Sequence, residues 1–161
     1  MTSLSLSDTR INVCFFRDAA QIYGETGLAP ATPDAAGIDL RACLPESDSL
    51  ELPPGERRVV PSGIAIEPAD GDVAAFVYSR SGLGAVRGVV VAQGVGVIDP
   101  DYRGEIVVFL LNTGHEAYTV RKGERVAQMV FHPILRPVVQ IVAELGKTGR
   151  GAGGFGHTGS T

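Results

Sequence analysis

An aspartate with a restricted backbone lies between two apolar segments of the chain. The stretch GVIDPDYRGEI spans Gly96 to Ile106, and within it Asp99 directly precedes Pro100. A residue before proline is confined to extended conformations, which fixes the direction of its carboxylate, and a preset carboxylate is what a general base requires. Asp and Pro also favour turns on their own account, so a plain β-hairpin tip is the alternative interpretation.

A short polar stretch offers the groups that hold phosphate. SRSGLG, Ser79 to Gly84, follows the apolar run VAAFVY. Arg80 supplies a guanidinium and Ser81 a hydroxyl, and the backbone amides around Gly82 are unobstructed, which is the combination that cradles phosphate oxygens. The alternative is a polar turn with a solvent-facing arginine.

Polar side chains also interrupt two other apolar segments. In AAGIDLRA, Asp39 and Arg41 alternate with Ile38 and Leu40, so the two charged residues would share one face of a strand. They could form a structural ion pair, or Asp39 could serve a metal ion. In KGERVAQMVF, Gln128 is the single polar residue inside a strand-like run, and a buried glutamine bonded to the backbone is its simpler interpretation.

The chain closes with GKTGRGAGGFGHTGST, in which seven of sixteen residues are glycine. Such a segment buries too little apolar surface to order itself, so a disordered tail is one interpretation. Arg150 and Phe155 are a cation and a stacking ring on a glycine chain, which indicates a closing lid instead. A P-loop is excluded because Ile141 stands where its first glycine is needed, and a Rossmann turn is excluded because only five residues follow Gly156.

The elements that must position these residues are short strands. Apolar, β-rich runs recur between Gly, Pro and Asp punctuation: INVCFF, RRVVPSGIAIEP, VAAFVYS, VVVAQGVGVI, EIVVFLL, AYTV, RVAQMVF and VVQIVAEL. Only SGLGAVR could form a helical turn. We expect an all-β domain over residues 1–145, built as a sandwich, barrel or jelly roll, followed by a flexible glycine-rich arm over residues 146–161. The valine-rich run GVVVAQGVGVI could serve a subunit contact as well as a core.

Composition excludes several functional classes. The net charge of −4 and the pI near 5.3 argue against a protein that binds a nucleic-acid backbone. The longest apolar run, Ile106–Leu111, is too short to span a bilayer, and the N-terminal residues lack the features of a signal peptide. Cys14 and Cys43 show no metal-binding spacing and are expected to be core thiols, with a disulfide as the minor alternative. We expect a soluble, cytoplasmic protein.

Five of these segments together resemble the motifs of one enzyme family. AAGIDLRA, SRSGLG, GVIDPDYRGEI, RVAQM and GRGAGGFGHTG follow the order and approximate spacing found in trimeric deoxyuridine triphosphatases, over residues Asp34 to Thr158. The resemblance implies a homotrimer of β jelly rolls with three sites at the subunit junctions. It also implies magnesium-dependent hydrolysis of dUTP to dUMP and pyrophosphate.

The resemblance further implies a role for each matching residue. Asp99 would be the base that activates water, and Tyr102 would pack against the deoxyribose and exclude a 2′-hydroxyl. The backbone around Val97 and Ile98 would hydrogen-bond the uracil edge. Asp39 would hold the waters of a Mg²⁺ ion carried by the triphosphate. The expected phosphate ligands are Arg80, Ser81, Gly82, Gln128 and Arg150.

The remaining implied contacts fall in the tail and in one turn. Phe155 would stack over uracil, and Gln93, Gly156 and Thr158 complete the expected substrate-binding set. The chain departs from the family pattern at three positions: Ile38 replaces an aromatic residue, Gln93 stands where many bacterial members have Asn, and His157 stands where many have Ser.

Two other functions remain open at this point. A dCTP deaminase would share the jelly roll and parts of the second and third motifs, but that family typically has Phe in place of Tyr102 and lacks the glycine-rich tail. A non-catalytic jelly-roll protein could bind nucleotide as a signal or serve only in assembly. The presence of both Asp99 and Arg150 argues against this second alternative.

Overall fold

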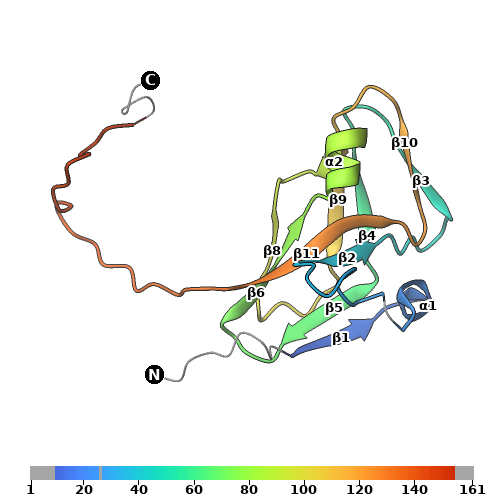
Figure 1. Ribbon diagram of the computed structural model, residues 1–161, viewed down its shortest axis with the longest axis horizontal. Helices are drawn as coiled ribbons and strands as arrows, with labels where there is room; N and C mark the ends of the chain where they lie inside the picture. Colours follow the sequence, from blue (N-terminus) through green and yellow to red (C-terminus); the bar gives the residue numbers. More distant parts are fainter. Residues whose placement is uncertain (1–9, 26, 155–161) are drawn as a thin grey trace.

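The computed structural model describes residues 10–25 and 27–154, and β-strands dominate it (Figure 1). The helices of this described part are α1 (Ala19–Tyr23) and α2 (Ser81–Arg87). The strands are β1 (Ile11–Phe15), β2 (Ile38–Arg41), β3 (Ser49–Leu52), β4 (Arg57–Pro61), β5 (Ile64–Pro68), β6 (Val73–Tyr78), β7 (Val89–Val91), β8 (Gly96–Ile98), β9 (Val107–Asn112), β10 (Tyr118–Arg121) and β11 (Arg125–Pro133). The prediction of a mostly β chain with short strands is therefore confirmed.

A four-stranded antiparallel sheet carries most of the polar residues singled out above. Its strand order is β2-β11-β6-β8, and β11 runs through its centre (Figure 1). The register places Gln128 of β11 opposite Asp39 on one side and opposite Tyr78 on the other. Three segments that are far apart in the sequence therefore meet at one level of the sheet.

The other strands form one sheet of order β4-β9-β7 and two strand pairs, β1-β5 and β10-β3. Side chains from these sheets share one apolar core with the β2-β11-β6-β8 sheet, and Leu40, Leu52, Ile64, Leu110 and Val120 are completely buried in it. No sheet in residues 10–25 and 27–154 closes on itself, so of the predicted alternatives the closed barrel is not the form seen.

One face of the β4-β9-β7 sheet leaves large apolar side chains exposed. Val59 and Phe109 lie opposite each other on β4 and β9, and Val107 lies two residues before Phe109 on the same face. Alternation along β9 sends Val108 and Leu110 into the core and these side chains outward. A contiguous apolar face of this kind is typical of an interaction surface.

One of the two helices was predicted from the sequence and the other was not. The helical turn expected at SGLGAVR is α2, which ends at Gly88 with φ +70°, a left-handed conformation that favours glycine. Helix α1 was not expected, because its five residues are too short for a recognisable helical period. It packs Ala19 and Tyr23 into the core.

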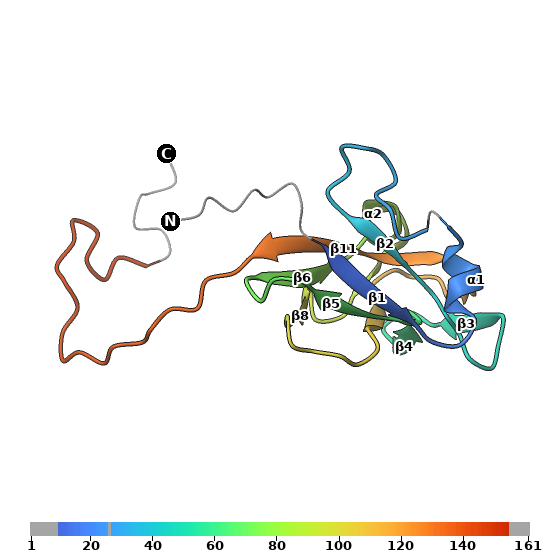
Figure 2. The ribbon, with the colours of Figure 1, turned by 90° about the horizontal axis from the view of Figure 1, so that it is seen from below.

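The expected final strand VVQIVAEL does not form. β11 ends at Pro133, and residues 134–154 leave the rest of the molecule as an extended arm (Figures 1 and 2). Its apolar side chains contact almost nothing: Leu135 is 94% exposed and Ile141 is 95% exposed. The β-rich composition is present, but a strand also needs a paired neighbour, and no described part of this chain supplies one.

The structure also bears on the predictions about membrane spans and cysteines. No helix in the described part is both long and apolar enough to cross a membrane. Both cysteines are free thiols, and Cys43 is buried as expected. The expectation for Cys14 was wrong, because it lies exposed on β1, which pairs with β5 and with no other strand in the described part of the chain.

Candidate active site

A charged cluster lies where β2, β11 and the end of β6 meet. The two carboxylate oxygens of Asp39 each contact one guanidinium: Arg80 Nε lies 2.8 Å from Oδ1, and Arg125 Nη1 lies 3.2 Å from Oδ2. Arg80 Nη1 also donates to the backbone oxygen of Arg125, at 3.2 Å. Asp39 thus holds two cations side by side. It forms ion pairs, as one interpretation of this residue predicted, but not with the expected partner.

The expected partner of Asp39 was wrong. Arg41 lies on the same strand, but its Nη1 donates to the backbone oxygen of Gly123 at 2.8 Å. The β11 ladder shifts register between Arg125 and Ala127, beside Arg41. This irregularity changes the local pairing at that point. The arginines that reach Asp39 are instead Arg125 at the start of β11 and Arg80 in the segment between β6 and α2.

Gln128 is bonded to the backbone, as its simpler interpretation predicted. Its Nε2 donates to the backbone oxygen of Ser79 at 3.0 Å. A Cβ on residue 37 would lie 2.9 Å from Oε1 of Gln128, which is too close. Gly37 therefore leaves room for the amide. Ser79 is fixed from the other side, since its Oγ accepts the N–H of Val91 at 2.8 Å. Ser79, the residue before Arg80, is therefore fixed by hydrogen bonds to Gln128 and to Val91.

These residues surround a cavity of about 250 Å³, which we call the Asp39 pocket. It is lined by Asp39, Arg80, Ser81, Arg125, Gln128, Gly37 and the small side chains of Ala31, Ala35 and Ala36. Ser81 and Gly82 form the first turn of α2, whose first amides lack partners within the helix. A Cβ on Gly82 would meet no atom within 4 Å, so a ligand can approach this backbone closely.

The donor set of the pocket limits how it could hold a Mg²⁺ ion. Asp39 is its only acidic residue, and both oxygens already contact arginine. No group of three or more His, Cys, Asp or Glu side chains that could hold a metal occurs within residues 10–25 and 27–154. Mg²⁺ keeps much of its water shell and is often bound by few carboxylates together with phosphates. The pocket therefore fits a Mg²⁺ ion that arrives on phosphate oxygens and meets Asp39 through water.

A second group of predicted residues lies in the loop that follows β8. We call residues 99–104 the Asp99 loop. The N–H of Tyr102 donates to the backbone oxygen of Asp99 at 3.1 Å, which closes a turn, and Tyr102 Oη donates to the backbone oxygen of Glu105 at 3.1 Å. A Cβ on Gly104 would come within 2.3 Å of that phenol oxygen, so the tyrosine needs a glycine at this position.

The expected uracil-binding residues lie next to this loop and face solvent. Val97 is 57% exposed and Tyr102 is 45% exposed, and Ile98 is half-buried on β8. Gln93 is exposed in the turn between β7 and β8, and a Cβ on Gly96 would lie 3.3 Å from its amide nitrogen. Asp99 is exposed on the rim of a groove of about 890 Å³.

Within one chain, the Asp39 pocket and the Asp99 loop lie at opposite ends of β6. Ile98 pairs with Ala75, so Asp99 follows at the level of Ala74, and Arg80 extends beyond the other end of the strand. Six residues of extended chain separate these levels, a distance of about 20 Å at roughly 3.3 Å per residue. The expected base and the expected phosphate ligands are therefore not brought together in a single chain.

The tail residues are described only in part. Arg150 Nε donates to the backbone oxygen of Gly153 at 2.9 Å, and the residue is exposed. It lies on the arm, which extends away from β2 and β11 (Figure 1). Phe155, Gly156, His157 and Thr158 lie outside the described residues.

Two residues at the Asp39 pocket were given no role by the sequence analysis. Arg125, the first residue of RVAQM, lines the pocket, and Ser79, the first residue of SRSGLG, accepts the hydrogen bond from Gln128. An arginine at the start of a strand and a serine in a polar turn usually face solvent, so neither was singled out. The one available signal was position, because each belongs to a segment whose other residues were already assigned a role.

Comparison with known proteins identifies the family. The dUTPase family model matches residues 26–159. The deoxyuridine 5'-triphosphate nucleotidohydrolase of Serratia proteamaculans (strain 568) is 50% identical over 129 residues, covering 80% of this chain and 84% of that protein. The chain belongs to the dUTPase family. The protein of the same name from Escherichia coli (strain K12 / DH10B) is 46% identical over the same length.

Solved dUTPase structures share the fold. The Staphylococcus bacteriophage 80alpha dUTPase with dUPNHPP superposes with a TM-score of 0.78 at 24% identity, covering 93% of this chain and 98% of that one. A mutant dUTPase from phage phi11 of S. aureus, described for its coordination of a structural Mg(II) ion, has a TM-score of 0.71 at 19% identity, covering 86% and 99%. At these identities the likeness establishes the fold alone.

Proposed function

We propose that this dUTPase-family protein hydrolyses dUTP to dUMP and pyrophosphate, keeping uracil out of DNA and supplying dUMP for dTMP synthesis. The observation that carries the proposal is the Asp39 pocket. It presents two guanidinium groups, a hydroxyl and open helix amides around one cavity. Such a set neutralises and positions phosphate oxygens, and phosphoryl transfer depends mainly on positioning and charge neutralisation.

The reaction needs one base and no covalent nucleophile. Asp99 takes a proton from water as the water oxygen attacks the α-phosphorus, and the bond to the β-phosphate oxygen breaks to release pyrophosphate. Arg80, Ser81, Gly82 and Gln128 hold the phosphate oxygens in place during this displacement. A Mg²⁺ ion bound by the triphosphate would neutralise phosphate charge, and Asp39 would hold its water.

Selectivity for deoxyuridine comes from the Asp99 loop and the strand before it. The backbone of Val97 and Ile98 pairs with the uracil edge, with Gln93 nearby. A site whose buried polar groups are left unpaired rejects an analogue strongly, by about 10⁴-fold in favourable cases. The exposed ring of Tyr102 lies beneath the deoxyribose and leaves no space for a 2′-hydroxyl.

The last part of the arm, residues 146–161, completes the site. Residues 1–145 form the enzymatic domain and residues 146–161 a flexible lid, in which Arg150 meets the terminal phosphates and Phe155 stacks over uracil. Gly156 and Thr158 contribute further contacts. The ten residues from Leu145 to Phe155 can extend to at most about 36 Å, enough to reach a neighbouring subunit.

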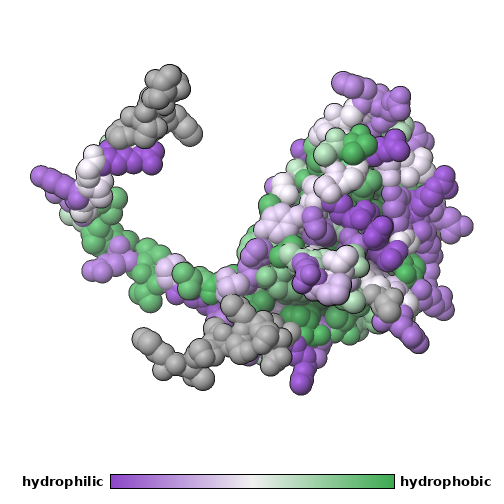
Figure 3. All heavy atoms as spheres, viewed as in Figure 1, coloured by the Kyte–Doolittle hydropathy of each residue, from purple (hydrophilic) through white to green (hydrophobic). Residues whose placement is uncertain are grey.

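A homotrimer with shared sites explains why one chain separates the two groups of residues. The Asp39 pocket of one jelly-roll subunit would meet the Asp99 loop of another. The two groups would then lie close together, although they are about 20 Å apart along β6 within one chain. Two unpaired apolar surfaces support such assembly. One is the face of Val59, Val107 and Phe109, and the other is the exposed arm, whose apolar side chains stand out in Figure 3.

Shared sites can be tested by mixing two inactive variants. Asp99→Asn and Arg80→Ala subunits are unfolded together, refolded as a mixture and assayed. In a mixed oligomer a site can combine an intact Asp99 from one subunit with an intact Arg80 from another, which restores about one quarter of the sites. Recovery of no activity, with refolded parent as the positive control, would show that each site lies within one chain.

The reaction itself is tested by its products. The purified protein is incubated with dUTP and Mg²⁺, and pyrophosphate and ammonia are measured separately, with dCTP in a parallel reaction. We expect pyrophosphate from dUTP only. Ammonia from dCTP would identify a deaminase, and nucleotide binding without either product would identify a non-catalytic protein. The acidic charge balance fits the absence of nucleic-acid binding, and we place the protein in the cytoplasm.

A further inference from the structure

Arg103 lies in the Asp99 loop but has no part in the proposed chemistry. Its Nη1 donates to the backbone oxygen of Pro100 at 2.7 Å and to that of Tyr102 at 3.2 Å. One guanidinium thus binds two carbonyl groups of the turn that carries the expected base. Hydrogen bonds that involve a charged group are stronger than neutral ones, so Arg103 fixes the shape of the loop from its concave side.

The same guanidinium ties the loop to strands elsewhere in the molecule. Arg103 Nη2 lies 3.1 Å from Oε1 of Glu67 on β5. The other carboxylate oxygen of Glu67 accepts the side-chain N–H of Asn12 at 3.0 Å, and Asn12 lies directly opposite Glu67 across the β1-β5 pair. The hydrogen bond from Asn12 and the charge of Arg103 lower the pKa of Glu67, which keeps it ionised at neutral pH. We call these three side chains the Arg103 tether.

The two ends of the loop are anchored very differently. At the far end, Glu105 accepts the N–H of Gly63 at 2.7 Å and pairs with Arg17, and the N–H of Ile106 donates to Ile64 at 2.8 Å. At the end that carries Asp99, the last strand pair is Ile98 with Ala75. Beyond that pair, the hydrogen bonds and ion pairs that connect this end of the loop to other elements, among the described residues, run through Arg103.

We infer that Arg103, held by Glu67 and Asn12, is a positioning residue that fixes the Asp99 carboxylate for its proton transfer. The inference rests on the proposed function, because it assigns Asp99 as the base. Arg103 and Glu67 are 52% and 48% exposed, and exposed ion pairs contribute little to stability. Displacement of a reacting group by about 1 Å can nevertheless cost about 10²-fold in rate. The tether therefore acts on turnover rather than on folding.

The test compares Arg103→Ala, Arg103→Lys and Glu67→Ala with the parent enzyme. We expect kcat to fall about 10- to 10²-fold in Arg103→Ala, with KM and the affinity for a non-hydrolysable dUTP analogue within about twofold of the parent. Arg103→Lys should recover little, because an ammonium cannot span both loop carbonyls and Glu67. Glu67→Ala should be milder, because Arg103 keeps its bonds to Pro100 and Tyr102.

A double variant and a matched control make the test specific. Adding Glu67→Ala to Arg103→Ala should lower kcat no further, since both act through one contact. Glu56→Gln is the control, because Glu56 also pairs with an arginine, Arg58, on an exposed strand end away from the loop. Its kcat should match the parent.

Several results would overturn the tether. Parental kcat in Arg103→Ala would do so, as would a loss of melting temperature or of oligomeric state that accounts for the lost activity. An additive loss in the double variant would separate Glu67 from Arg103. The proposed function has its own controls: if the parent does not hydrolyse dUTP, or if Asp99→Asn keeps its activity, the assignment of the reaction or of the base has failed, and not the tether alone.

Discussion

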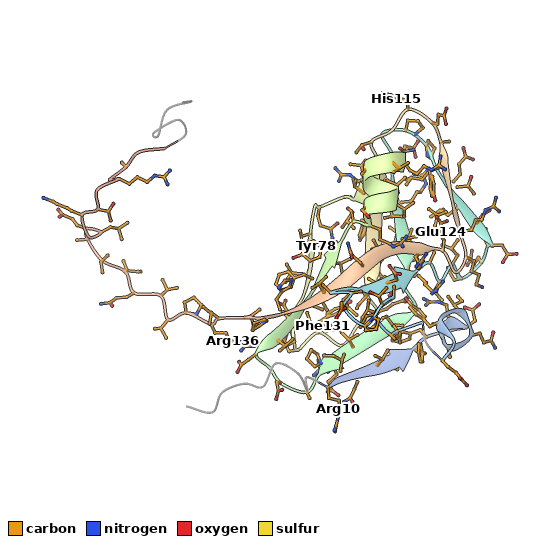
Figure 4. The ribbon with its side chains drawn as sticks, in the orientation of Figure 1. Arg10, Tyr78, His115, Glu124, Phe131 and Arg136 are labelled. Atoms are coloured by element: carbon orange, nitrogen blue, oxygen red, sulfur yellow. The ribbon has the colours of Figure 1, made fainter. Side chains whose placement is uncertain are left out.

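The Asp39 pocket lies across three paired strands, whereas the Asp99 loop lies past the end of β8 on the outer edge of the same sheet. In the pocket, Asp39 contacts Arg80 and Arg125, and Gln128 donates to the backbone oxygen of Ser79. In the loop, the expected base is exposed and is held indirectly through Arg103. Figure 4 shows Tyr78 at the pocket end of β6 and Arg136 at the start of the arm.

This difference corresponds to two tasks. Phosphate binding needs several fixed charges in one place, which a sheet provides because its register aligns residues from distant segments. A base that must meet substrate on another subunit has to project from the body, and it then loses the support of the sheet. We therefore expect changes in the loop to alter catalysis, and changes in the core behind the strands of the pocket to alter stability.

Substitution of the base should have the largest effect. Asp99→Asn keeps the shape of the side chain but cannot accept a proton from water, so kcat should fall about 10³-fold. The dissociation constant for a non-hydrolysable dUTP analogue should stay near that of the parent, because the proposal assigns phosphate binding to the Asp39 pocket. Parental turnover in this variant would remove Asp99 from its role.

Removal of residues 146–161 should have the next largest effect. The described residues of this segment have exposed side chains away from the core, so the melting temperature should change little. Without Arg150 against the developing phosphate charge, kcat should fall about 10²-fold, with a smaller loss of nucleotide affinity. Arg150→Ala and Phe155→Ala should each reproduce part of this loss. Full activity of the truncated protein would show that the segment is not a lid.

Tyr102→Ala tests the specificity assigned to the Asp99 loop. Removal of the ring opens space beneath the sugar, so discrimination between dUTP and UTP should relax about 10-fold or more. The measurement is the ratio of kcat/KM for the two nucleotides. Tyr102→Phe is the control, since it keeps the ring and loses only the hydrogen bond to Glu105. An unchanged ratio in Tyr102→Ala would contradict the steric role.

The smallest effect on turnover is expected in the core next to β2, the strand that carries Asp39. Tyr23 is buried, accepts the N–H of Arg41 on β2 at 2.9 Å and donates to the backbone oxygen of Ser62 at 3.0 Å. Tyr23→Phe should lower the free energy of unfolding by about 1 kcal/mol and leave kcat nearly unchanged. Chemical denaturation with a parallel activity assay checks both values. A kcat loss larger than the stability loss would place Tyr23 with the catalytic residues.

Tyr23→Phe should also change how the free energy of unfolding depends on pH. Burial raises the pKa of Tyr23 to about 12, against about 10 for an ordinary tyrosine. The folded protein therefore keeps a proton that the unfolded chain loses, so this contribution to stability is complete below about pH 10 and is lost as the pH rises toward 12. The decline of unfolding free energy over that range should be shallower in Tyr23→Phe. Part should remain, because the pKa of Tyr118 is also raised to about 12 by its burial and by Glu124.

Much of the fold was determined by local pattern in the sequence. Short apolar, β-rich runs predicted the strands that became β1, β6, β9 and β11, and glycine, proline and aspartate marked their ends. Two elements escaped this pattern, because α1 and β3 are too short to establish a period. The run VVQIVAEL carries a strand composition without a strand, since composition cannot say whether a pairing partner lies within the same chain.

The candidate site shows the same division. The sequence alone determined which residue types are present and in what local context: a carboxylate before proline, an arginine and serine before glycine, and a glutamine within an apolar strand. The tertiary structure decided which of them meet. Asp39, Gln128 and Tyr78 share one level because β11 pairs with both β2 and β6, while Asp99 follows at the level of Ala74, four residues or about 13 Å away along β6. Strand register depends on how all the apolar faces pack together, and no single segment of sequence contains that information.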